Sequence, residues 1–65
     1  MNWDMIEGKW KRMKGRVKEQ WSELSDDELT AIEGRRERLE GKLQEHYGLG
    51  REEARRQVDR FLARI

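Results

Sequence analysis

The sequence has no cysteine and no proline, and it has no apolar run long enough to cross a membrane. Without cysteine, neither a disulfide nor a thiolate metal site can form, so a reducing compartment is the default expectation. The absence of proline and the scarcity of β-branched residues leave mostly ordinary helix formers. No secretory signal is recognisable at the start of the chain. We therefore expect a cytoplasmic, helical protein with no membrane contact.

Charge is abundant but balanced. Charged residues make up 45% of the 65 residues, yet the formal net charge is only +1. The two signs are segregated, because residues 9–18 carry bases and no acid while residues 19–33 carry acids and no base. The overall balance supports solubility without a strong global attraction to nucleic acid or acidic lipid.

A block of sequence returns 26 residues later. Ile6-Glu7-Gly8 recurs as Ile32-Glu33-Gly34, and the segment 15–21 recurs in kind as 41–47. So short a unit cannot bury its own apolar stripe, which predicts an internal pseudo-repeat of two helical units packed on each other.

Apolar residues spaced by three or four predict an all-α fold in one domain, residues 1–65. We expect about three to four helices, the main ones near 4–22, 26–46 and 51–64, with a break in the first at Gly8 or Gly15. Glycines inside helices favour close helix–helix approach or a bend, and contact between backbone and ligand is the alternative.

Local signals mark two of the helix ends. Ser25 and Glu28 have the spacing of a capping box, with Leu24 and Leu29 placed as a hydrophobic staple around it. Gly48 is a natural left-handed residue at the end of the second main helix.

Motifs distributed over most of the chain resemble the CsbD-like family of small bacterial stress proteins. They are Trp10, Lys14–Glu19, Leu24–Asp27, Gly34, Leu39, Gly41, Gln44-Glu45 and Tyr47-Gly48. The resemblance implies two crosswise-packed helical hairpins, accumulation of the protein under stress, and no established biochemical activity. It supplies no catalytic residue.

The sharpest candidate for a binding site is the turn at residues 48–56. Gly48-Leu49-Gly50 resembles the turn of helix-hairpin-helix DNA-binding modules, in which backbone N–H groups meet a phosphate at a helix N-terminus. The nearby arginines Arg51, Arg55 and Arg56 could add contacts that do not read base sequence. The acids Glu52 and Glu53 argue against this, and a plain connection between helices is the alternative.

The basic run at residues 9–18 is the second candidate nucleic-acid contact, through Lys11, Lys14 and Lys18. A solvated face is the alternative, as is docking on the acidic stretch 19–33 of the same or another molecule. Trp10 is expected in the core rather than in a stacking site.

No residue pattern indicates catalysis, a cofactor or a metal. The single histidine, His46, is expected in the last turn of a helix, near its carbonyl end. The sequence favours a non-enzymatic stress-response protein, without a small-molecule substrate, that acts through weak surface contacts as a monomer or weak homo-oligomer. The alternatives are a nucleic-acid-binding module and a self-associating protein with Trp3 at the contact.

Overall fold

A computed structural model describes residues 2–65, and within them the chain forms helices and no strand. The five helices are α1 (Trp3–Gly8), α2 (Trp10–Gln20), α3 (Asp26–Ile32), α4 (Arg36–Tyr47) and α5 (Arg51–Arg64). The prediction of an all-helical protein is confirmed, and the last helix matches its predicted range.

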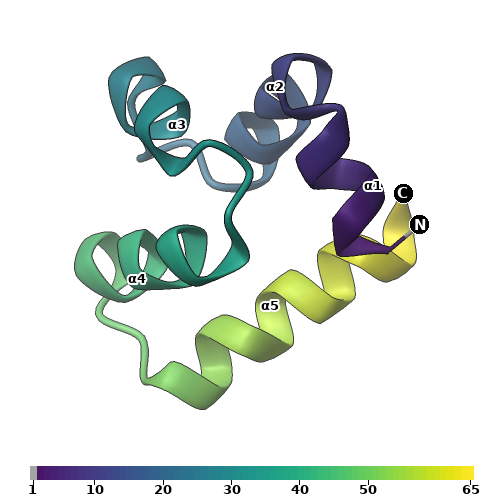
Figure 1. The fold of residues 1–65 in the computed structure, drawn as a ribbon. Coiled ribbons are helices and arrows are strands. Elements are labelled where there is room, and N and C mark those ends of the chain that lie inside the picture. The colour runs from purple at the N-terminus through teal and green to yellow at the C-terminus, as the bar shows by residue number, and fades with distance from the viewer. Residues whose placement is uncertain (1) are drawn as a thin grey trace.

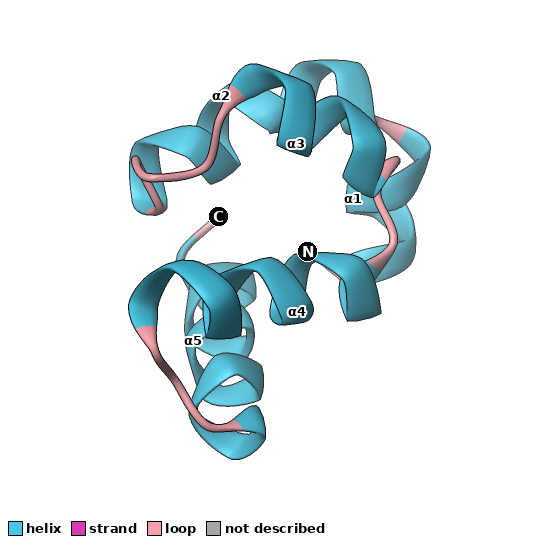
Figure 2. Ribbon diagram, turned by 90° about the vertical axis from the view of Figure 1, so that its left-hand side faces the viewer, coloured by secondary structure: helices cyan, strands magenta, loops and turns pink. Residues whose placement is uncertain are grey.

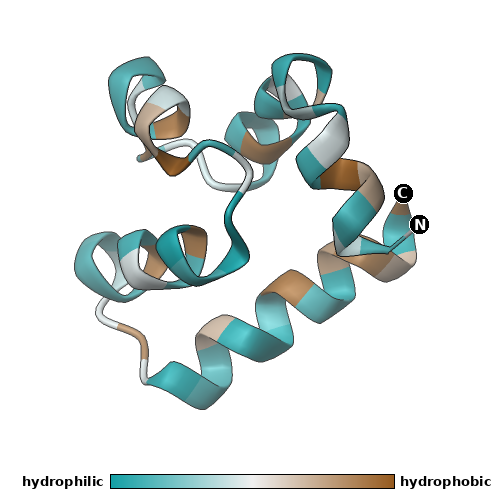
Figure 3. Ribbon diagram, viewed as in Figure 1, coloured by the Kyte–Doolittle hydropathy of each residue, from teal (hydrophilic) through white to brown (hydrophobic). Residues whose placement is uncertain are grey.

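The helices form two layers around a single core. Helices α1, α2 and α3 lie on one side, and the hairpin of α4 and α5 lies on the other (Figures 1 and 2). The apolar stretches of the helices turn toward the space between the layers (Figure 3). The Cα atoms span only 27 × 25 × 18 Å, and every helix contributes at least one buried side chain to the core.

The predicted apolar stripes make up this core. The buried apolar side chains are Ile6, Met13, Val17, Trp21, Leu24, Leu29, Ile32, Leu39, Leu43, Ala54, Val58 and Phe61. Trp3 and Trp10 are half-buried and pack against them, with their ring centroids 6.3 Å apart. Trp3 therefore covers the edge of the core.

The tryptophan N–H groups connect elements that are distant in sequence. Trp10 Nε1 donates to the carbonyl oxygen of Leu29 across 2.8 Å and so joins α2 to α3. Trp21 Nε1 donates to Gln57 Oε1 of α5 across 3.0 Å, and its ring centroid lies 5.3 Å from that of Phe61. These bonds allow the large rings to be buried without leaving a polar atom unpaired.

Both predicted helix ends are confirmed. The Ser25 hydroxyl accepts from the backbone N–H of Glu28, and the Glu28 carboxylate accepts from the N–H of Ser25, each across 3.1 Å. Gly48 ends α4 in the left-handed conformation, with φ 64°, and its N–H donates to the Gln44 carbonyl oxygen.

The expected first helix breaks in the region predicted. Helix α1 ends at Gly8 and α2 begins at Trp10, with Lys9 as the residue between them. Gly15 lies inside α2 and causes no break.

The prediction of one continuous helix over 26–46 was wrong, which raises the helix count to five. Glu33 and Gly34 both adopt left-handed backbone conformations, with φ 55° and 76°, so the chain stops after α3 and restarts at Arg36. A Cβ on Gly34 would lie 3.0 Å from the Cα of Glu7. The break thus brings buried Gly34 directly against α1, which a continuous helix could not do.

Candidate functional site

The glycine turn between α4 and α5 has the backbone conformation expected of a connection between helices. Gly48 is left-handed, while Gly50 is extended and starts α5 without a side-chain cap. The acids Glu52 and Glu53 occupy the first turn of α5, where they already complement the positive end of the helix dipole. The electrostatics of this turn are therefore less favourable for a phosphate than the glycine spacing alone predicts.

The three arginines of this turn differ in their surroundings. Arg56 forms ion pairs with Glu52 at 3.6 Å and Glu53 at 3.1 Å. Arg51 and Arg55 are exposed and line a hollow between α4 and α5 together with Glu37, Glu40 and Gln44. Acidic side chains consequently lie close to all three of the arginines predicted to contact phosphate.

In the basic run, two of the three predicted lysines contact α3. Lys18 Nζ lies 2.9 Å from Asp26 Oδ1, and this hydrogen bond and charge hold the pKa of Asp26 below its ordinary value. Lys14 Nζ lies 3.5 Å from the hydroxyl of Thr30. The basic run therefore docks in part on the acidic stretch of its own chain, which is one of the alternatives that the sequence leaves open.

The remaining bases of this run are exposed, and together they are here called the α2 basic face. Its members are Lys9, Lys11, Arg12 and Arg16. Over residues 2–65, no ion pair to any of the four is found within 4.0 Å. Of these four bases, only Lys11 is among the residues that the sequence predicts to contact nucleic acid. The sequence does not reveal which bases of the run pair with α3.

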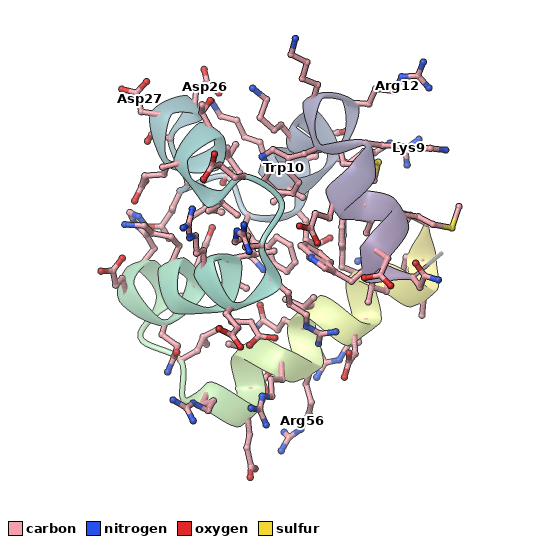
Figure 4. The ribbon with its side chains drawn as sticks, in the orientation of Figure 1. Lys9, Trp10, Arg12, Asp26, Asp27 and Arg56 are labelled. Carbon is pink, nitrogen blue, oxygen red and sulfur yellow. The ribbon has the colours of Figure 1, made fainter. Side chains whose placement is uncertain are left out.

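The two basic regions lie on opposite sides of the molecule. Lys9 and Arg12 project from the upper layer, whereas Arg56 projects from the lower one (Figure 4). The view in Figure 2 likewise separates α2 from the start of α5. The residues predicted to contact nucleic acid are therefore divided between two surfaces rather than brought together on one.

A charged cluster between α3 and α4 is a feature that the sequence analysis missed. The Glu28 carboxylate, already part of the capping box, lies 2.7 Å from His46 Nε2 and 3.5 Å from Lys42 Nζ. The hydrogen bond with His46, together with those from Ser25, lowers the pKa of Glu28 to about 2. His46 does lie in the last turn of α4, as expected, but its partner is a carboxylate of another helix. Nothing local in the sequence links residues 28 and 46.

Residues 2–65 provide neither a metal-binding cluster nor a membrane-spanning helix. There, His, Asp and Glu side chains nowhere gather in groups of three or more with the placement needed to hold a metal ion. No helix in that part of the chain combines the length and the apolar character needed to span a membrane.

Comparison with known proteins places the chain in a family. The profile of the CsbD-like family matches residues 4–56. The chain belongs to this family. The match runs from α1 into the first half of α5, so it includes both the α2 basic face and the glycine turn.

Several curated relatives are about 50% identical to this CsbD-like chain over the aligned residues. UPF0337 protein YjbJ of Escherichia coli is 52% identical over 59 residues, which are 91% of this chain and 86% of YjbJ. UPF0337 protein PA4738 of Pseudomonas aeruginosa is 49% identical over the full length of both chains. UPF0337 protein NE2439 of Nitrosomonas europaea is 51% identical over 94% of this chain and 65% of its own length. The relatives are bacterial proteins, and membership of the family supports a role in the stress response.

Proposed function

We propose that this CsbD-like chain is a non-enzymatic, cytoplasmic stress-response protein whose α2 basic face makes weak contacts with acidic surfaces of other proteins. The observation that carries the proposal is the set of four exposed bases along α2 without an acidic partner in the described chain. Most other charged groups of the molecule have an internal partner or lie near the opposite charge. The α2 basic face therefore carries four bases without an ion pair within residues 2–65, and the acids Glu7 and Glu19 line the hollows beside them.

The strength of such contacts follows from their exposure. An exposed ion pair contributes about 0–1 kcal/mol and is screened by salt over about 8 Å at physiological ionic strength. Four such groups can hold a partner only weakly, and they select it by charge rather than by shape. Absence of enzymatic activity is part of the proposal, and it is supported by the side chains that could react: Ser25 caps α3, while His46 and Glu28 bind each other.

A protection assay with a heat-labile client protein of net negative charge tests the proposal. The chain is added at an equimolar ratio, and light scattering follows client aggregation at low and at physiological salt. The test variant replaces Lys11, Arg12 and Arg16 with glutamine. The matched control replaces Arg51, Arg55 and Arg60, which are exposed on α5, with glutamine and so also removes three positive charges.

We expect the wild type and the α5 control to delay aggregation and the α2 variant to lose most of that protection. The effect should weaken as salt is added, because exposed charges carry it. No protection by the wild type at low salt, or equal protection by both variants, would contradict the proposal.

Nucleic-acid binding at residues 48–56 is the second candidate. It is favoured by one observation: Arg51 and Arg55 are exposed at the positive end of α5, beside a glycine turn that leaves the backbone accessible. Amide chemical shifts, followed while short duplex DNA is added at low and then physiological salt, test it. Shifts at Gly48–Arg56 that persist at physiological salt would support this function. Shifts that salt abolishes, or that fall only on α2, would exclude the turn as a DNA site.

The block of sequence that recurs after 26 residues further suggests that the fold arose from two copies of one helical unit. Helices α2 and α4 begin at Trp10 and Arg36, positions that differ by 26. Ile6 and Ile32, which correspond in the repeat, are both buried, and so are Val17 and Leu43. These positions support an arrangement in which each unit consists of a short helix followed by a longer one.

A further inference from the structure

One short segment, residues 33–35, connects the two layers of the fold and is here called the hinge. Helices α1, α2 and α3 precede it in the chain, and the hairpin of α4 and α5 follows it (Figure 1). Each of these two parts has bonds of its own. Trp10 Nε1 donates to the Leu29 carbonyl oxygen within the first, and Arg36 bonds to Asp59 within the second. The hinge therefore divides the chain into two internally bonded parts.

The contacts between the two parts do not involve the hinge. Trp21 Nε1 donates to Gln57 Oε1, and the Trp21 ring packs against Phe61. The hydroxyl of Tyr47 accepts from the backbone N–H of Glu23 across 3.1 Å. The α4–α5 hairpin of a second copy could make the same contacts, because none of them requires both residues to belong to one chain.

The hinge is bent against the backbone preference of one of its residues. Glu33 is left-handed, with φ 55°, which is unfavourable for a residue other than glycine. Arg35 starts α4 without a side-chain cap. If the hinge were helical, the last carbonyl groups of α3 would accept from the first N–H groups of α4. The bend is maintained by packing on α1, since Trp3 donates to the Gly34 carbonyl oxygen and Glu7 lies against Gly34.

We propose that two copies of this chain exchange their α4–α5 hairpins, with the hinge of each copy straightened into helix. Straightening within a single molecule would remove the hairpin from the core, and the loss of apolar burial outweighs any relief at Glu33. In a pair, each core is rebuilt from α1–α3 of one copy and α4–α5 of the other. A short hinge under strain favours such an exchange.

The kind of assembly and its conditions follow from this geometry. A reciprocal exchange gives a closed twofold dimer, which does not grow further. The two layers must separate before they can exchange, so partial unfolding promotes the dimer and the folded monomer forms it slowly. The hairpin of the same chain competes at an effective concentration on the order of 1 mM, so the dimer also requires concentrated protein. The α2 basic face takes no part in the exchange.

Refolding from urea at protein concentrations up to about 1 mM, followed by size-exclusion chromatography with light scattering, tests the proposal. The wild type should yield a dimer whose fraction rises with the protein concentration during refolding. Gly34→Ala should raise the dimerisation constant at least about tenfold, because alanine disfavours the bend and favours helix in both copies. Glu33→Gly should lower the constant, since glycine accepts the bend and weakens the helix.

Gly48→Ala is the matched control for Gly34→Ala. Gly48 is also left-handed, with φ 64°, but it lies inside the exchanged hairpin, and an added Cβ would meet no atom within 4 Å. Its replacement should leave the dimerisation constant at the wild-type value. Glu33→Gly keeps the hinge testable if the Gly34→Ala chain fails to refold.

Nuclear Overhauser effects in a dimer refolded from isotope-labelled and unlabelled chains identify the exchanged part. Effects between the rings of Trp21 and Phe61 should arise between chains, whereas those between Trp10 and Leu29 should stay within one chain. A wild type that is wholly monomeric after refolding at about 1 mM would overturn the proposal. So would Trp21–Phe61 effects confined to one chain, since the dimer would then be a surface contact.

The hinge itself has its own contradicting results. Equal dimerisation of Gly34→Ala and Gly48→Ala, or wild-type dimerisation of Glu33→Gly, would show that the exchange does not depend on the conformation of residues 33–35.

Discussion

Trp3 donates its indole N–H to the carbonyl oxygen of Gly34 across 2.7 Å, and this bond joins the start of the chain to the break between α3 and α4. Gly34 has no Cβ, and the backbone of Glu7 lies against the space that a Cβ would occupy. The left-handed conformation of Gly34 and the packing of α1 therefore depend on each other. A residue with a side chain at position 34 would be destabilised both by the left-handed backbone conformation and by close contact with α1.

Gly34→Ala should lower the free energy of unfolding by about 3 kcal/mol, since it combines left-handed strain with a close contact in the interior. The control is Gly48→Ala, where φ is 64° but an added Cβ would meet nothing within 4 Å. That variant should lose only about 1 kcal/mol, the cost of the backbone conformation alone. Urea unfolding followed by tryptophan fluorescence measures both. Equal losses in the two variants would mean that the contact with Glu7 contributes nothing.

Acidification should weaken the fold through Glu28. The carboxylate has an ordinary pKa of 4.5, and its bonds to His46 and Ser25 lower that pKa to about 2 in the folded chain. The unfolded chain thus takes up a proton at a higher pH than the folded chain does. The stabilising contribution of Glu28 is consequently complete above pH 4.5 and is lost as the pH falls toward 2.

Glu28→Gln isolates this contribution, because glutamine can preserve the capping box without the charge. The free energy of unfolding, measured by urea at pH 6 and at pH 3, should fall less in this variant than in the wild type. Asp27→Asn, which changes an exposed acid in the same helix turn, should show the wild-type fall. A wild-type pH dependence in Glu28→Gln would show that other carboxylates account for the acid sensitivity.

Arg36 joins α4 to α5 through several bonds at once. Its guanidinium lies 2.7 Å from Glu40 and 2.7 Å from Asp59, and it also donates to the carbonyl oxygen of Arg55. Burial acts against its charge, but the hydrogen bonds to Asp59 and Glu40 outweigh that effect and raise the pKa of Arg36. Arg36→Ala should therefore cost about 2 kcal/mol, the range expected for lost charge-assisted hydrogen bonds.

Arg38→Ala is the comparison for this prediction. Arg38 is also bonded to an acid, Glu33, but this partner is only five residues away in the chain and the pair is exposed. Its loss should cost less than about 1 kcal/mol in the same urea experiment. If both substitutions cost the same, the bridge to α5 would be no more important than a surface ion pair.

The sequence predicts those parts of this fold that depend on neighbouring residues. The capping box of α3, the end of α4 at Gly48 and the buried stripes all follow from spacings of three to five residues. The break after Ile32 accompanies the packing of Gly34 against Glu7, a contact between residues distant in sequence that local spacing does not reveal. Likewise, the bond between Glu28 and His46, and the pairing of Lys18 with Asp26, depend on how helices pack. The members of the α2 basic face can therefore be defined only once the structure shows which bases of the run contact α3.

The two mid-helix glycines, Gly15 and Gly41, provide the last prediction. The sequence favours close helix approach or bending at both, yet an added Cβ meets no atom within 4 Å at either position. Gly15→Ala and Gly41→Ala should therefore each raise the free energy of unfolding by about 0.5–1 kcal/mol, since alanine restricts the unfolded chain and suits a helix. Thermal unfolding at a low protein concentration measures this for the isolated molecule. A loss of stability at either position would show that the glycine serves the packing of the fold.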